Sequence, residues 1–392
     1  MNDDELLSPL LRRPELPPSK VDIERALRSG RRRERGRRLL AVAAAAIAVG
    51  VTVAGIAALG PRHRAAPPAH ETPRPTAPSR SGCSVHRLPT PGDRPATVDA
   101  VDPDGRYAVG TLDGADDSVM VWAAGVLQVL EGTPRPNASP VAVNASGVVV
   151  GNAGDEAAPI PWMLKDHVFT ALAWPPGAQS VTVAGINAAG DIAGTATWEQ
   201  NGQATKARIV RWNAARPDVV TYVTSNPAVA VAAAIGADGT IAGLGRDGAS
   251  GDTRAYLWAP DGTPRALERS PGRPALGATG IAGDWVIGYY EDGSTWFNQG
   301  LRWNLRTGEV RELGDFAPGA IDTSGRMFGS LMRGADETPP ARWKDGKTSE
   351  LPVLSAGQSA VVTSASADGR LVAGRLQRAK NDPVVPVRWS CA

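Results

Sequence analysis

The residue types that most often carry enzyme chemistry are scarce in this sequence. Cysteine occurs twice and histidine four times in 392 residues. The sequence has no G-x-S-x-G, no H-E-x-x-H and no serine three places before a lysine, so the usual nucleophile and zinc motifs are missing. Beyond residue 82 the only histidines are His86 and His167, each in a short predicted strand. The sequence therefore indicates no catalytic residue, no metal site and no cofactor.

Long apolar runs are also rare, and the exception lies near the N-terminus. Residues 39–60, "LLAVAAAAIAVGVTVAGIAALG", carry no charge and are long enough to cross a bilayer as a helix. The 38 polar residues before them do not fit the short leading region of a signal peptide. Because the run is rich in alanine and glycine, a cleaved signal peptide or a buried helix remains an alternative. We expect one transmembrane helix.

The arginines before this run set its predicted orientation. Residues 28–38 hold seven arginines, and the positive-inside rule places residues 1–38 in the cytoplasm as a basic tail. The predicted location is thus the cell membrane, single-pass, with the rest of the chain extracellular. Binding of nucleic acid or anionic lipid by the arginines is the alternative interpretation.

The remaining chain divides into a linker and one large domain. Residues 61–82 are rich in proline and alanine and have almost no large apolar side chains, which is typical of a disordered linker. Residues 83–392 hold 27 Lys/Arg and 32 Asp/Glu, a formal charge of −5. This balance predicts no nucleic-acid partner for the outer domain.

An internal repeat runs through residues 83–392. Seven segments share an apolar run, a turn built on Asn, Asp or Gly, a second apolar run and a glycine. They are "VDAVDPDGRYAVG" (98–110), "VAVNASGVVVG" (141–151), "VAGINAAGDIAG" (183–194), "AAAIGADGTIAG" (232–243), "ATGIAGDWVIG" (278–288), "GAIDTSGRMFG" (319–329) and "TSASADGRLVAG" (363–374).

A tryptophan follows each of these segments at one repeat position, and its large ring suits the space between neighbouring sheets. These predicted core residues are Trp122, Trp162, Trp212, Trp258, Trp303, Trp343 and Trp389. After most of them comes a turn and a last short strand. Each unit of about 44 residues thus predicts four strands, a to d, and no helical period, which is typical of a β-propeller blade. The sequence therefore predicts an all-β fold, a seven-bladed β-propeller.

The two cysteines lie at the ends of this domain. The last unit supplies only strands a, b and c, and the missing strand d is "SVHRL" (84–88), so both termini build one blade in a Velcro closure. Alignment with another unit puts Cys83 and Cys391 across a tight turn, with Cα atoms within about 7 Å. A disulfide is expected there, worth roughly 5 kcal/mol. Free thiols with a metal or nucleophile role are the alternative.

The repeat resembles the extracellular HAF repeats, whose units contain an apolar "GIN-x-x-G-x-V-V-G" stretch followed by a "HAF-x-W" one. The nearest copies here are "GINAAGDIAG" (185–194) and "RAYLW" (254–258), and most copies lack the His-Ala-Phe triplet. The resemblance implies a secreted or surface-exposed propeller. The tail, the Ala/Gly/Val run and the linker look like those of surface proteins of high-GC Gram-positive bacteria, the actinobacterial type.

Candidate binding residues gather in the connections between strands b and c, which are predicted to face outward, and Trp174 in a d–a connection (173–179) should reach the same face. Aromatic rings with amide and acidic neighbours suit stacking on a sugar or gripping a peptide, although such rings can also cap the ends of blades. The candidates are Trp174, Trp198, Glu199, Tyr289, Tyr290, Glu291, Asp292, Trp296, Phe297 and Asn298.

Three functions are compatible with these features, and the fold alone does not choose among them. The first is a membrane-anchored extracellular module that binds a glycan, peptide or protein ligand. The second is an extracellular carbohydrate-active hydrolase or lyase, which would need two carboxylates across a cleft. The third is a transmembrane sensor whose short tail binds a cytoplasmic regulator.

Overall fold

A computed structural model describes most of the repeat domain. The described residues are 82–113, 118–123, 126–129, 137–154, 158–200, 203–223, 229–246, 253–268, 275–290, 299–333, 338–379 and 382–392. Within these ranges the chain is built from β-strands, with one short 3₁₀ turn, η2 (Pro91–Asp93). The all-β prediction is confirmed.

Five separate four-stranded antiparallel blades are present. The first two are β2 (Ala100–Val101), β3 (Tyr107–Leu112), β4 (Ser118–Ala123), β5 (Val126–Val129), and β6 (Ser139–Val143), β7 (Val149–Ala153), β8 (Ile160–Lys165), β9 (Val168–Ala171). Two more are β18 (Ala275–Ala282), β19 (Trp285–Tyr290), β20 (Gln299–Asn304), β21 (Val310–Glu312), and β22 (Phe316–Ile321), β23 (Met327–Leu331), β24 (Pro340–Lys344), β25 (Lys347–Glu350). The closing blade is β26 (Ser359–Ala365), β27 (Leu371–Gln377), β28 (Val385–Cys391) and β1 (Cys83–Arg87).

The third and fourth repeat copies form one eight-stranded sheet rather than two separate blades. Its strands are β10 (Ser180–Ile186), β11 (Asp191–Gln200), β12 (Gln203–Asn213), β13 (Arg216–Tyr222), β14 (Val229–Ile235), β15 (Ile241–Arg246), β16 (Thr253–Trp258) and β17 (Pro264–Ala266). A single parallel pair, Ala207 with Val229, joins β12 to β14. The prediction of seven separate blades is therefore wrong. The physical reason is that the long strand β12 reaches the start of β14 and hydrogen bonds across the boundary between the copies.

The predicted transmembrane helix is not supported. None of the helices in the described part of the chain is long and apolar enough to cross a membrane. The run at 39–60, on which the prediction rested, lies outside the described residues, as do the tail and the linker. That prediction used the length of the run, its lack of charge and its misfit to a signal peptide, although its many alanines and glycines bring little apolar area.

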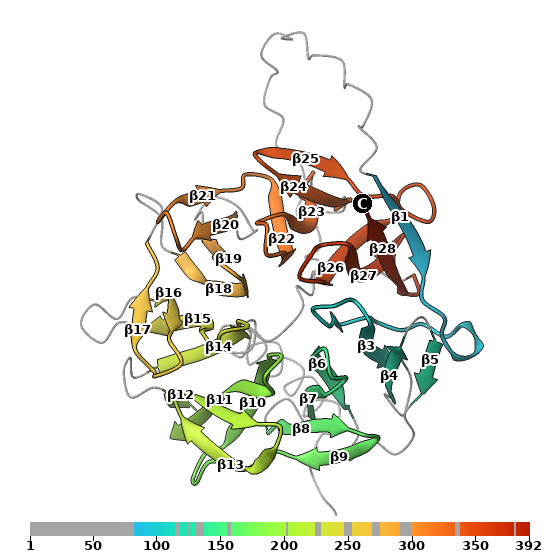
Figure 1. Cartoon of the computed structure of the whole chain (residues 1–392). Helices are drawn as coiled ribbons and strands as arrows, with labels where there is room; N and C mark the ends of the chain where they lie inside the picture. The colour runs from blue at the N-terminus through green and yellow to red at the C-terminus, as the bar shows by residue number, and fades with distance from the viewer. Residues whose placement is uncertain are drawn as a thin grey trace, which may run out of the picture. The chain divides into compact units, whose positions relative to one another are not determined.

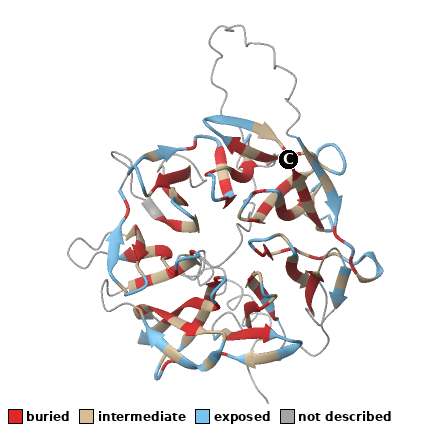
Figure 2. Cartoon of the chain, in the orientation of Figure 1, coloured by how far each residue is buried: buried red, intermediate tan, exposed pale blue. Residues whose placement is uncertain are grey.

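The sheets follow one another around a common centre, and consecutive sheets contact each other (Figure 1). The last strand of each repeat copy is its most exposed one, whereas the middle strands are buried (Figure 2). The core thus consists of layers between facing sheets. The seven repeat tryptophans belong to these layers, and each has a relative exposure of 4% or less.

The tryptophans also fix the connection that leads into their own sheet. Four of them donate an indole N–H to a carbonyl oxygen of that connection at 2.7 to 2.8 Å: Trp122 to Pro89, Trp212 to Ala173, Trp303 to Glu268 and Trp389 to Pro352. The hydrogen bond satisfies the one polar group of a buried indole. One residue type therefore fills the layer and anchors the preceding loop.

The glycine that closes each repeat motif is required by space. A Cβ on Gly151 would lie 2.3 Å from the carbonyl oxygen of Ser139 and 2.4 Å from the ring of Trp162. The same crowding against the first strand of the unit is found at the other six closing glycines. At Gly151, therefore, the closing glycine of the repeat motif and the core tryptophan of the same unit are in contact.

In five of the seven units the turn between the first two strands is built on a buried polar side chain. Asn144 Oδ1, for example, accepts the backbone N–H groups of Ser146 and Val148 at 3.0 Å each. The residues at the corresponding positions are Asp102, Asn187, Asp322 and Ser366, and all five are 4% exposed or less. Such side chains replace the backbone partners that a tight turn lacks.

These turns also bind one another around the ring. The amide of Asn144 donates to the carbonyl oxygen of Asn187 at 3.2 Å, and the Thr323 hydroxyl donates to that of Ala367 at 2.8 Å. The backbone N–H of Ala367 in turn donates to the carbonyl oxygen of Pro103 at 2.8 Å. Neighbouring sheets are therefore locked by hydrogen bonds at this end as well as by apolar packing.

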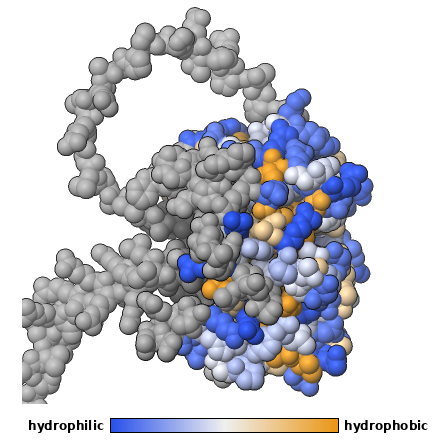
Figure 3. Space-filling view, turned by 90° about the vertical axis from the view of Figure 1, so that its left-hand side faces the viewer, coloured by the Kyte–Doolittle hydropathy of each residue, from blue (hydrophilic) through white to orange (hydrophobic). Residues whose placement is uncertain are grey.

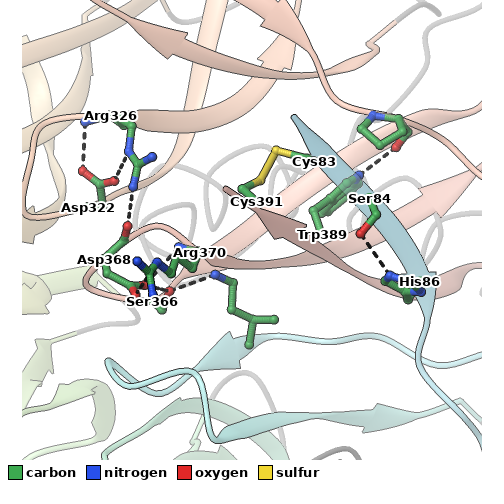
Figure 4. Close-up of a disulfide and its surroundings, with 12 residues drawn as sticks. Cys83, Ser84, His86, Asp322, Arg326, Ser366, Asp368, Arg370, Trp389 and Cys391 are labelled. Carbon is green, nitrogen blue, oxygen red and sulfur yellow. Dashed lines mark hydrogen bonds and ion pairs between the residues drawn. A yellow bond between two sulfur atoms is a disulfide. The ribbon is translucent and has the colours of Figure 1, made fainter. Parts of the chain in front are cut away.

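The termini of the domain close the ring as predicted. Strand β1 pairs antiparallel with β28, and Cys83 lies opposite Cys391 in the register. Their Cα atoms are 4.1 Å apart and their sulfur atoms are bonded (Figure 4). The Velcro closure and the disulfide are thus confirmed. The bond joins positions 308 residues apart in sequence.

Removal of the disulfide should destabilise the whole domain. Because the loop it closes is long, Cys83→Ser with Cys391→Ser is expected to lower the free energy of unfolding by about 3–5 kcal/mol. Urea unfolding of the purified protein measures this change. Reduction of the unaltered protein should give the same loss, and reduction of the double variant should add nothing. An unchanged unfolding midpoint in the double variant would contradict the proposed role of the bond.

Crowding at the closing glycine can be tested separately. Gly151→Ala should lower the free energy of unfolding by at least about 3 kcal/mol, because backbone and a ring must both move. Gly357→Ala is the control, since Gly357 has a φ of +77° but nothing within 4 Å of an added Cβ. That control should cost only about 1 kcal/mol of backbone strain. Equal losses in the two variants would show that space is not the constraint.

Candidate functional site

Strand direction divides the connections between two ends of the sheets. In each antiparallel unit the turns after the first and third strands share one end, and the other two connections share the opposite end. Every connection between the second and third strands contains residues outside the described ranges. The predicted candidates Glu291, Asp292, Trp296, Phe297 and Asn298 fall among them.

The third repeat copy carries the part of this end that the structure describes best. Strands β11 and β12 are 10 and 11 residues long, whereas the corresponding strands of the other units have five to seven. The pairing runs without a break from Asp191 with Asn213 to Trp198 with Lys206, and a bulge follows. The hairpin therefore extends beyond the end of its own first strand, β10.

Trp198 lies on this extension and packs on the connection that precedes β10. Its indole Nε1 donates to the carbonyl oxygen of Pro176 at 3.3 Å. In the same connection, Trp174 donates from Nε1 to the carbonyl oxygen of Ala178 at 2.9 Å and is 37% exposed. The two tryptophans predicted to share this end of the domain are thus held by one loop.

Two cations and a third ring complete the cluster. Lys206 Nζ lies 4.8 Å from the centroid of the Trp198 ring, and the guanidinium of Arg208 lies 5.7 Å from that of Tyr222. The Trp198 and Tyr222 rings are 6.2 Å apart, and Tyr222 is 46% exposed. We name Trp174, Trp198, Lys206, Arg208 and Tyr222 the aromatic wall. Cation–π contacts of this kind hold long cationic side chains in place without neutralising them.

Sequence reasoning missed three members of the aromatic wall. Lys206 and Arg208 lie two apart on β12, so they share one face of the strand with Trp198, and Tyr222 pairs with Val210 on that same strand. The signal was the alternation in "KARIVRW", which reads equally well as an ordinary solvent-facing strand.

Tyr289 and Tyr290 are placed differently from the prediction, which put them on an outward loop. Both belong to strand β19. The hydroxyl of Tyr289 donates to the carbonyl oxygen of Pro318 at 2.5 Å, and burial raises the pKa of this phenol to about 12. Tyr290 is 3% exposed, with its hydroxyl 3.3 Å from Glu312 Oε2. These two rings serve packing between sheets.

Glu199 is the only candidate acid among the described residues. It is exposed, and its backbone N–H donates to Gln179 Oε1 at 2.9 Å. Within the described ranges no group of three or more His, Cys, Asp or Glu side chains is arranged to hold a metal ion. The acidic pairs of the loops, such as 116–117, 155–156 and 336–337, lie outside the described residues.

One partly buried carboxyl group stands out in the interior. Asp99 lies next to the first strand of its unit, where its Oδ2 accepts the hydroxyls of Thr97 at 3.2 Å and Thr111 at 3.3 Å. Burial raises the pKa of this carboxyl to about 6, against the lowering effect of the two hydroxyls and of Arg375. The group is therefore neutral in acid and charged at neutral pH.

Asp99 should make the stability of the domain depend on pH. Because its pKa is raised in the folded state, its stabilising contribution is full below about pH 4 and is lost as the pH rises through about 6. Asp99→Asn keeps an acceptor for both hydroxyls and should raise the free energy of unfolding at pH 7 by at most about 3 kcal/mol. The difference should shrink toward pH 4 in urea unfolding.

A sign control is available for this measurement. Hydrogen bonds from Thr263 lower the pKa of the exposed carboxyl of Asp261, so Asp261→Asn should give a pH dependence of the opposite sign. A constant difference between the Asp99→Asn protein and the unaltered one from pH 4 to pH 7 would contradict the assignment.

Outside these features the visible surface is polar. The coloured part of the face in Figure 3 is mostly hydrophilic, and its apolar residues form small separate patches.

Comparisons with known proteins support the β-propeller fold but do not identify a function. No protein-family model matches the sequence, and no curated protein is significantly similar to it. The structure is similar to an oligogalacturonate lyase from Vibrio parahaemolyticus (12% identity, TM-score 0.54, covering 78% of this chain and 93% of that one). It is also similar to the β-propeller domain of the Trilobed protease from Pyrococcus furiosus, which has an open velcro topology. That likeness has 10% identity and a TM-score of 0.51, and it covers 76% of this chain and 93% of that one.

A puromycin-hydrolyzing peptidase from Mycobacterium tuberculosis is similar over 80% of this chain and 54% of its own, with 14% identity and a TM-score of 0.53. At such identities the likeness shows the fold alone. The class is thus a β-propeller, closed by a strand from each terminus. The resemblance to HAF repeats and the actinobacterial type stay predictions.

Proposed function

We propose that this β-propeller is an extracytoplasmic ligand-binding module and that it binds its ligand at the aromatic wall. The observation that supports this most is the pairing of two rings with two cations beside the extended hairpin, Lys206 with Trp198 and Arg208 with Tyr222. Tyr222 and Trp174 remain more than a third exposed. A ring kept partly exposed and fixed by hydrogen bonds suits recognition better than packing.

The charges of the wall favour an acidic glycan as the ligand. Aromatic faces stack on the apolar faces of sugar rings, and Lys206 and Arg208 are placed to pair with carboxylate groups on the same chain. The two cations are partly buried beside the rings, so salt screens them less than it screens free surface charges. A peptide ligand, the other expectation from the sequence, would need pockets for side chains.

The disulfide supports a location outside the cytosol. Disulfides form and persist in oxidising compartments and are rare in reducing ones. We therefore place the wall where extracellular or cell-wall glycans are accessible. The predictions of a hydrolase or lyase and of a signalling role with a cytoplasmic partner gain no support from the residues described.

Binding can be measured by calorimetry with soluble acidic oligosaccharides, such as oligouronates, and with neutral oligosaccharides of equal length. Trp198→Ala and Tyr222→Ala should each weaken binding of the acidic series about tenfold, or about 1.4 kcal/mol. Lys206→Gln should weaken it and also reduce its salt dependence. Val168→Ala, an exposed apolar change on another blade, is the control and should bind normally.

Two results would overturn this proposal. One is binding that is indifferent to Trp198→Ala and Lys206→Gln in proteins with unchanged melting temperatures. The other is equal affinity for acidic and neutral oligosaccharides, or none for either. Saturable binding of unstructured peptides in place of glycans would equally reject the acidic glycan as ligand.

A further inference from the structure

Four repeat units carry an arginine immediately before their core tryptophan. These residues are Arg211, Arg302, Arg342 and Arg388. Successive residues of a strand point to opposite faces of the sheet. Since each tryptophan packs toward the preceding unit, each arginine points toward the unit that comes next. The repeat therefore gives an internal comparison of one arginine in four surroundings.

Two of these arginines bind the turn of the next unit. Arg211 donates from Nη2 to the carbonyl oxygen of Gly239 at 2.8 Å and from Nη1 to that of Pro260 at 3.2 Å. Arg302 donates from Nη1 to the carbonyl oxygen of Gly325 at 3.4 Å. Both acceptor glycines occupy the same place in their turns. The arginine thus links its own unit to the turn of the next unit by hydrogen bonds.

Arg302 also lies between two aromatic rings. Its guanidinium is 4.3 Å from the centroid of the Trp285 ring in its own blade and 4.5 Å from that of Trp343 in the next. The residue is 7% exposed. Trp285 therefore fills the space beside the buried cation.

The third arginine, Arg342, does not bind the turn of the next unit, and Arg326 makes that contact instead. At the junction between the β22–β25 blade and the closing blade, Arg326 donates to the carbonyl oxygen of Asp368 and pairs with Asp322 at 2.6 Å. Figure 4 shows this contact between the two turns. Arg342 itself is only partly buried, and its side chain makes no hydrogen bond or ion pair with the residues described.

Arg388 stands at the seam where the closing blade meets the β2–β5 blade. By register its surroundings correspond to those of Arg302: Leu371 takes the place of Trp285, Trp122 that of Trp343, and Gly105 that of Gly325. Leucine is much smaller than tryptophan. Within the described chain, the side chain of Arg388 makes no hydrogen bond or ion pair, so it does not bind the turn carbonyl that its counterparts use.

A cavity occupies the space that the missing indole leaves. Its volume is about 70 Å³, several times the about 10–15 Å³ that one water needs. We name it the seam pocket. Besides Arg388 it is lined by Leu88, Val101, Tyr107, Trp122 and Leu371, with Gly105, Arg106, Ala108 and Ala373 completing the wall. An arginine whose side chain makes no hydrogen bond or ion pair with the described residues thus lines a small, mostly apolar cavity.

We propose that the seam pocket binds the carboxylate of a small organic acid, with Arg388 as its anchor. A half-buried cation with no partner is unfavourable, and a planar carboxylate matches the guanidinium fork with two parallel hydrogen bonds. The second cation of the lining, Arg106, is already engaged by Asp104 at 3.0 Å and by the carbonyl oxygen of Ala145. A single available cation in the described lining favours a monoanion over a phosphate dianion.

The apolar lining indicates the character of the rest of the ligand. Leu88, Val101 and Leu371 offer contacts to a short aliphatic tail, whose burial is favourable. The volume limits the tail to a few carbons. The expected ligand is therefore a short-chain carboxylate rather than a sugar acid with several hydroxyls, which would find few partners on these walls.

The seam pocket is independent of the aromatic wall. It lies by the Gly105 turn, at the end of the sheets opposite to the connections that carry Trp174 and Trp198. Failure of one site therefore says nothing of the other.

The test uses the full domain, with its disulfide intact, titrated with acetate, propionate and butyrate. The indole N–H resonance of Trp122, which lines the pocket, reports occupancy by NMR. We expect saturable shifts with propionate or butyrate and about tenfold weaker binding by Arg388→Gln. Arg342→Gln, the same substitution at the same register without a pocket, should bind as the unaltered protein does.

A second variant fills the cavity. Leu371→Trp recreates the surroundings of Arg302 and should abolish the shifts while keeping the melting temperature within a few degrees. Sodium sulfate at equal ionic strength should give no saturable shift. The proposal is overturned if Arg388→Gln binds propionate normally, if no carboxylate gives saturation, or if sulfate binds as well as the carboxylates.

Discussion

The hydrogen-bonded pairing of β1 with β28 is the interaction on which the rest of the structure depends. A ring of sheets has no free end sheet only if its last sheet is complete, and the C-terminal repeat supplies three of the four strands. The five residue pairs from Cys83 with Cys391 to Arg87 with Val387 provide the fourth. This pairing joins the two ends of the domain, and the contacts between the closing blade and the β2–β5 blade lie beside it.

The disulfide strengthens that pairing at the point where it would otherwise fray. In the other units a short covalent turn connects the third strand to the fourth, and here the chain has no such turn. The bond between Cys83 and Cys391 takes its place. The seam is nonetheless different from the other junctions. Leu371 and Arg388, which has no partner in the described chain, stand where the β18–β21 blade has Trp285 and a tightly held Arg302.

Much of the fold could be predicted from the sequence because every repeat copy meets the same packing requirement with the same residue types. The closing glycine and the core tryptophan, as at Gly151 and Trp162, recur because the ring packs where a side chain on the glycine would lie. The cysteines were placed by counting strands. The joining of two repeat copies into one sheet could not be predicted. It depends on a single pair, Ala207 with Val229, which exists because one hairpin is longer than its counterparts.

The candidate site was only partly predictable for a related reason. Trp174 and Trp198 were brought together correctly by strand direction alone. Lys206 and Arg208 were missed because alternating charges are common on exposed strands, and only the observed distances to the rings distinguish them. Tyr289 was assigned to a loop because Gly288 ends the repeat motif, whereas the strand continues through it to Tyr290. A motif boundary is not a boundary of hydrogen bonding.

The cross-link at the seam has one more consequence. Together with the main chain, it makes residues 83 to 391 a closed covalent circle. A single cut in any exposed loop would therefore release no fragment. It would convert the domain into a circularly permuted chain with new ends at the cut, in which every sheet is still covalently joined to the next.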